Sequence, residues 1–186
     1  VNGTAVDIIG ADSVVNNTGV ITATNGKAGY RLSNGASLDL TGDGTTNADG
    51  TAHGILLDTG AAGLTVKDAT INMAATGTGN GIENRAEIDG IQLTNTTINV
   101  GKGAGVRTSA SLAQTNSGTI NVNGAGTGLL FQNANGSASD KAYDMSKSQG
   151  LVINVNSAAG KGMTTNTSGA IKSGVSVNIN DAAGGS

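Results

Sequence analysis

An apolar–polar–apolar triplet recurs along this 186-residue chain and constrains its fold more than any other feature. In a β-strand, alternate side chains face opposite sides, so each triplet can bury its two outer residues and expose its central one. The clear copies, all with asparagine in the centre, are Ile71-Asn72-Met73, Ile98-Asn99-Val100, Ile120-Asn121-Val122, Ile153-Asn154-Val155 and Val177-Asn178-Ile179. Weaker copies are Ile21-Thr22-Ala23 and Leu38-Asp39-Leu40.

Each triplet is followed by a glycine that usually precedes an apolar residue, as in Gly54-Ile55 and Gly105-Val106. Another triplet, such as Leu64-Thr65-Val66 or Ile91-Gln92-Leu93, stands seven residues before two of the main copies. Each repeat therefore offers three short strands, separated by corners where glycine and asparagine allow the positive φ that sharp bends need.

This pattern predicts an all-β fold, a right-handed parallel β-helix with three sides and about seven irregular coils. The triplets begin at residues 21, 38, 71, 98, 120, 153 and 177, so the coils differ in length from 17 to 33 residues. We assign the differences to corner insertions near 41–52 and 134–141, because added loop residues cost little closure entropy. A helical solenoid is excluded by the absence of 3.6-residue periodicity, and a β-sandwich would not need the same motif seven times.

The sequence reads as one partial domain over residues 1–186, since the repeat is interrupted at both ends. We therefore expect a stretch of a longer array without caps. Only three residues, Tyr30, Phe131 and Tyr143, are aromatic, so the core must be narrow and filled by small branched side chains. Phe131 is expected to point inward, which argues against a groove that stacks sugars on aromatic rings.

The charge content excludes several classes of partner. Charged residues make up 12% of the chain, and the formal net charge is −3. No basic patch is evident, so we expect no nucleic-acid partner. No apolar run approaches the roughly 18 residues of a membrane-spanning helix, so we expect no membrane insertion of this segment. The absence of cysteine excludes disulfides and thiolate zinc sites.

No constellation of catalytic, cofactor-binding or metal-binding residues stands out. His53 is the only histidine and is expected at a surface or corner. The carboxylates are scattered, although stacking of coils could bring Asp39, Asp58 or Asp68 together. Glycine-rich runs such as 101–105 lack the Lys-Ser/Thr ending of a phosphate-binding loop. We therefore expect no enzyme and no cofactor.

The central asparagines form the one candidate site. If the register holds, they stack into a ladder whose side-chain amides hydrogen-bond to one another. This ladder either only stabilises the rod or also pairs with another rod or a glycan. Its members are Asn72, Asn99, Asn121, Asn154 and Asn178.

The asparagine-centred triplets, the glycine-rich corners and the lack of cysteine resemble the passenger domains of Gram-negative autotransporters, above all the adhesive, self-associating type. The resemblance implies a rod at the bacterial cell surface, tethered to the outer membrane through a region outside this sequence. It implies adhesion, self-association or biofilm formation, with another copy or a host glycan or protein as partner. A polysaccharide-processing enzyme and a passive spacer for a distal binding domain are the alternatives.

Overall fold

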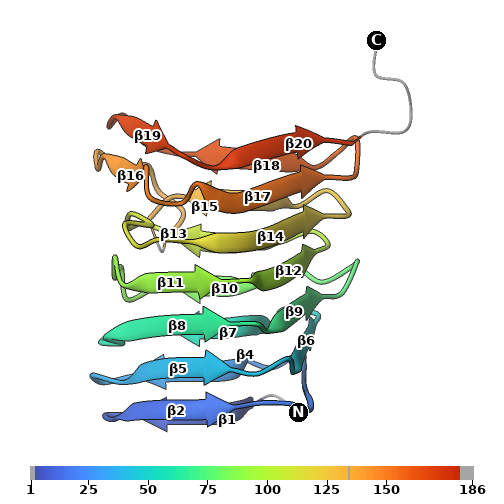
Figure 1. The fold of residues 1–186 in the computed structure, drawn as a ribbon, viewed down its shortest axis with the longest axis vertical. Coiled ribbons are helices and arrows are strands. Elements are labelled where there is room, and N and C mark those ends of the chain that lie inside the picture. The colour runs from blue at the N-terminus through green and yellow to red at the C-terminus, as the bar shows by residue number, and fades with distance from the viewer. Residues whose placement is uncertain (1–2, 134, 181–186) are drawn as a thin grey trace.

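The computed structural model describes residues 3–133 and 135–180, which form a parallel β-solenoid without any helix in these ranges. Strands from successive coils stack directly on one another into flat sheets, as Figure 1 shows. The solenoid is right-handed, as β–crossover–β connections between parallel strands almost always are. The predicted fold is thus confirmed, while the chain ends, on which the expectation of a longer array depends, lie outside the described residues.

Three faces, named A, B and C here, meet at the corners of every coil. Seven coils follow from the seven strands stacked on face A and on face C. Face A contains β1 (Thr4–Ile9), β4 (Ala28–Ser33), β7 (His53–Leu57), β10 (Ile82–Asn84), β13 (Ala104–Thr108), β15 (Thr127–Phe131) and β18 (Lys161–Thr165). Face C contains β3 (Val20–Thr24), β6 (Thr45–Asp49), β9 (Thr70–Met73), β12 (Thr96–Val100), β14 (Ser117–Val122), β17 (Gly150–Val155) and β20 (Ser176–Ile179).

Face B is interrupted. In the first four coils it is a regular sheet, but in the fifth coil the irregular segment 109–116 takes the place of a strand. A separate two-stranded sheet follows. It is joined to the irregular segment of the fifth coil by the backbone N–H of Asp144, which donates to Ser111 Oγ. Face B contains β2 (Asp12–Asn16), β5 (Ser37–Thr41), β8 (Gly63–Lys67) and β11 (Ile91–Thr94), followed by β16 (Tyr143–Met145) and β19 (Ile171–Ser173).

One expected corner insertion, near 41–52, is wrong. Residues Thr45–Asp49 form β6, which pairs in register with β3 and β9. The triplet Leu38-Asp39-Leu40 belongs to face B, and the face C triplet of the second coil is Thr46-Asn47-Ala48. Thr46 is buried although it is polar, and for this reason the apolar pattern did not reveal it. The ladder spacing is accordingly 22 to 33 residues rather than 17 to 33.

The other expected insertion falls in an irregular loop between β15 and β16. Of its residues, Ala134 lies outside the described part of the chain. Ser139 bridges to Thr167 of the next coil, and Lys141 pairs with Glu87 at 2.7 Å, two coils below. This loop accounts for the spacing of 33 residues between two rungs of the ladder.

The repeated glycines have a different role from the one expected. They lie within or beside face A strands and do not have positive φ. A Cβ on Gly105 would lie 2.6 Å from the carbonyl oxygen of Gly128 and 2.6 Å from Ile120 Cγ2 on face C. Glycine is therefore required because faces A and C approach too closely for a side chain. The same contact recurs at Gly54, Gly81 and Gly128.

Candidate functional site

A continuous ladder of side-chain amides runs along face C. Each asparagine is one rung of this ladder. From the second rung on, the Nδ2 group of each asparagine donates to Oδ1 of the asparagine one coil nearer the N-terminus. The bonds are Asn72 to Asn47 at 3.1 Å, Asn99 to Asn72 at 2.7 Å, Asn121 to Asn99 at 2.8 Å, Asn154 to Asn121 at 3.0 Å and Asn178 to Asn154 at 3.0 Å. The stacking expected of the five asparagines is confirmed, and Asn47 joins them as a sixth member.

Strand pairing explains why the ladder forms. Ile98 and Ile120 are register partners with their side chains in the core, so Asn99 and Asn121 face outward directly above one another. Neighbouring strands lie about 4.8 Å apart, a distance that two asparagine side chains can bridge. The unequal corner lengths do not disturb this spacing, because each corner returns the chain to the same register.

A shorter second ladder flanks the first. Asn156 donates to Asn123 at 2.9 Å, and Asn180 donates to Asn156 at 3.0 Å. These residues follow the triplets by one position and are exposed. They were missed because only the central position of the triplet was compared between coils.

The column on the other side of the main ladder is made of hydroxyl-bearing and β-branched residues. Pairing places them in one line, and neither this column nor the main ladder contains a charged side chain. The members, from the first coil to the seventh, are Val20, Thr45, Thr70, Thr97, Thr119, Val152 and Ser176. These two columns are therefore neutral and regularly spaced, and the exposed Asp49 at the end of β6 is the one charged residue in the strands of face C.

Face A, unlike the columns of face C, carries a charged surface, a stripe of ion pairs. Arg31 binds Asp7 at 3.2 Å and Asp58 at 2.9 Å. Burial alone would raise the pKa of Asp58, but hydrogen bonds from the Thr59 N–H and from Arg31 outweigh it and lower this pKa. The stripe contains all three arginines of the chain, which come from different coils: Arg31, Arg85 and Arg107.

Glu83 is the most deeply buried charged group of the stripe, at 1% exposure. Its carboxylate accepts hydrogen bonds from Arg85 Nε at 3.2 Å, from Asn80 Nδ2 at 2.6 Å and from Arg107. Arg107 also donates to the carbonyl oxygen of Asn133 at 2.7 Å, which ties the long loop to face A. Paired in this way, Glu83 links its own coil to the next coil through Arg107.

His53, expected at a surface or corner, begins strand β7 next to a corner and is half-buried. Its Nδ1 accepts a hydrogen bond from the backbone N–H of Asn80 at 3.0 Å. Desolvation is the main cause of a lowered pKa of His53, to which the charges of Arg85 and Arg107 contribute and which Glu83 opposes. The imidazole is therefore neutral at neutral pH.

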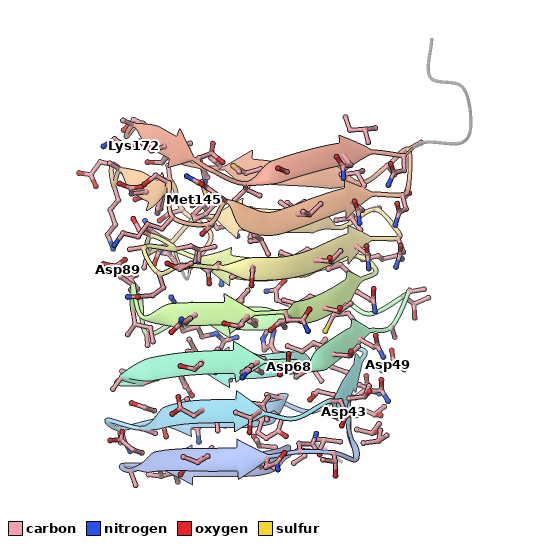
Figure 2. All side chains as sticks on the ribbon, viewed as in Figure 1. Asp43, Asp49, Asp68, Asp89, Met145 and Lys172 are labelled. Carbon is pink, nitrogen blue, oxygen red and sulfur yellow. The ribbon has the colours of Figure 1, made fainter. Side chains whose placement is uncertain are left out.

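Glu87 and Asp89 lie together beside Lys141, and the other carboxylates among the described residues are spread over the coils. Figure 2 shows Asp43 and Asp49 near one edge of the coils, Asp68 in the middle and Asp89 at the opposite edge. Asp68 accepts a hydrogen bond from Asn95 at 2.9 Å. Within the described residues, no group of three or more acidic, histidine or cysteine side chains is arranged to hold a metal ion.

The three aromatic side chains lie in the core. Phe131 points inward as predicted, and its ring centroid is 4.7 Å from that of Tyr143. Burial raises the pKa of the Tyr30 hydroxyl. None of these rings is therefore free to stack against a sugar on the surface.

Comparisons with known proteins give no assignment: no family model, no curated protein and no solved structure matches the chain. Among the described residues, no helix is long and apolar enough to cross a membrane. The structure thus shows a β-solenoid with two distinct polar stripes, the amide ladder of face C and the ion-pair stripe of face A.

Proposed function

We propose that this chain is an adhesive rod of the bacterial cell surface that associates side by side with other copies of itself through face C. The amide ladder carries the proposal. Each asparagine amide has two N–H donors and an oxygen with two lone pairs, and the ladder uses one donor and one lone pair of each inner rung. Every inner rung therefore keeps one donor and one acceptor for a partner.

The regular spacing of these groups favours another copy as the partner. Coils of any copy repeat at the same distance of about 4.8 Å, so two C faces can match rung for rung along their whole length. A partner with a different repeat loses register within a few rungs. Many weak hydrogen bonds can then add up, although each is worth only about 1 kcal/mol.

The low charge of face C supports the same function. The main ladder and the column of Thr45, Thr70, Thr97 and Thr119 contain no charge, and Asp49 is the one charged residue in the strands of face C, so electrostatic repulsion between two such faces is small. The carboxylates of face A, in contrast, are engaged with arginines, which favours a structural role for them over catalysis. A cell-surface location rests on the resemblance to autotransporter passengers.

Charge placed on face C tests the proposal. We expect Asn99→Lys combined with Asn121→Lys to abolish association in sedimentation velocity, and aggregation of cells that display the chain. The matched control is Thr65→Lys with Gln92→Lys, which adds the same charge to outward positions of face B. Circular dichroism and thermal unfolding verify that both variants keep the fold.

The control variant separates the outcomes. Association lost in the face C variant alone supports the proposal. Association unchanged in both variants, or absent in the parent chain, contradicts it and leaves the ladder as a stabilising feature of a passive spacer. Association through the unpaired strand edges at the open ends of the solenoid would survive both changes.

A further inference from the structure

Three basic side chains line one cavity on face A, two from the corner where coils enter the face and one from the end of a strand where the chain leaves it. Lys27 precedes β4, His53 begins β7, and Arg85 follows β10. Together with Leu56 and Asp58 they line a cavity of about 280 Å³ on the outer side of the face. Lys27 is exposed and the side chain of Arg85 is 45% exposed, so the cavity is accessible from solvent.

The hydrogen bonding of His53 leaves a mismatch in this cavity. Because Nδ1 accepts from the backbone N–H of Asn80, the proton of the neutral ring is on Nε2. Nε2 lies 3.3 Å from Nη2 of Arg85, which also carries only hydrogen-bond donors. Two donors therefore face each other, and neither can accept from the other. An oxygen atom with free lone pairs, placed beside both, would satisfy them together.

The charge of the stripe favours an anionic oxygen. The one carboxylate in the cavity wall, Asp58, is already engaged by Nε of Arg31 at 3.0 Å, by Nη2 at 2.9 Å and by the Thr59 N–H at 3.0 Å. Around the cavity three carboxylates of the stripe meet four cations, and the exposed Asp49 stands at the same corner with its carboxylate accepting from the Gly50 N–H at 2.6 Å. The cations are Lys27, Arg31, Arg85 and Arg107, and the carboxylates are Asp7, Asp58 and Glu83.

We propose that Lys27, His53 and Arg85 form an oxyanion-binding site that takes the carboxylate or sulfate group of an acidic polysaccharide. The two N–H groups of His53 and Arg85 converge on one oxygen, and Lys27 adds a compact positive charge. A polymer suits the location, because the cavity opens on a long face along which further sugar units can lie. The site is separate from face C and does not depend on self-association.

The single histidine gives a direct readout. In protein labelled with ¹⁵N-histidine, NMR should report the Nε2–H tautomer, and the Nδ1–H tautomer would overturn the proposal. Tetragalacturonate should then shift the His53 nitrogen signals and saturate, with a Kd at least tenfold below those of monomeric galacturonate and inorganic sulfate. No shift with any of the three probes would refute a site. Equal affinity for sulfate would refute the polysaccharide and leave a site for small free anions only.

Variants distinguish this site from general charge attraction. Lys27→Gln should weaken tetragalacturonate binding by about tenfold, the value of one charge-assisted hydrogen bond. Lys102→Gln is the matched control, since Lys102 is also exposed at a corner between faces C and A. His53→Asn keeps an oxygen acceptor for Asn80, removes the Nε2 donor and should weaken binding similarly. Equal weakening by Lys27→Gln and Lys102→Gln would contradict the assigned site.

Discussion

A single added methyl group at Gly105 provides a sharp test of how faces A and C pack. In Gly105→Ala the new Cβ would lie 2.6 Å from the Gly128 carbonyl oxygen and 2.6 Å from Ile120 Cγ2. Ordinary carbon contacts are about 3.5–4.0 Å, so the overlap approaches 1 Å on both sides. The oxygen belongs to a strand of the next coil, and Ile120 lies in the core, so neither can yield without disturbing a sheet.

The magnitude follows from two opposing effects. Overpacking of this kind costs about 1–3 kcal/mol, whereas replacing glycine in a strand recovers about 0.5–1 kcal/mol of chain entropy. We expect a net destabilisation of about 1–2 kcal/mol, which for a chain of this length lowers Tm by about 2–8 °C. Gly90→Ala is the matched control, because its nearest neighbour, the carbonyl oxygen of Ala62, is 3.8 Å away and its φ is not positive. Equal Tm values for the two variants in thermal unfolding would refute the close-packing argument.

Three further predictions concern the polar stripes. Asn121→Ala removes two hydrogen bonds of the ladder and should lower the free energy of unfolding, measured by chemical denaturation, by about 1–2 kcal/mol. A decrease below about 0.3 kcal/mol would show that water fully replaces these two bonds. Glu83→Gln should lower the free energy of unfolding by about 2–4 kcal/mol, because Arg85 and Arg107 lose a buried countercharge. The same decrease should be measured at raised salt concentration. Burial and the two arginines lower the pKa of His53 against the opposing pull of Glu83, so the unfolded chain binds this proton more readily. The contribution of His53 to stability should accordingly be complete above pH about 6.5 and fall as the pH drops below it. This part of the slope should be absent in His53→Asn, while the loss due to Asp58 at lower pH should remain.

The amide ladder could be predicted from sequence because its signal is local. In Ile98-Asn99-Val100 the alternation fixes which side chain faces outward, and the repeat of the same triplet implies stacking. Asn47 shows the limit of this reasoning, because Thr46 stands where an apolar residue was expected. An asparagine 25 residues before Asn72 was the signal available for it.

The ion-pair stripe could not be predicted, because its partners meet only after the corners are fixed. Arg31 and Asp58 stand 27 residues apart, and Arg107 and Glu83 stand 24 apart, without a shared motif around them. Their contact depends on where each corner returns the chain to face A. One miscounted residue in a corner would move a side chain from the surface to the core.

The glycine and asparagine columns together explain how such irregular coils keep one register. From the second coil to the seventh, the glycine of face A lets a β-branched residue of face C approach its backbone, as Gly81 does with Ile98 and Gly128 does with Ile153. That contact holds the triplet in place from inside, and the asparagine beside it bonds to its neighbours outside. Corner loops can then vary by eleven residues between successive rungs, from 22 to 33, without moving the rungs. Since the corners are free to vary while face C is not, sequence change on this rod can alter its corners, including the site proposed at Lys27, while the surface proposed for self-association keeps its spacing.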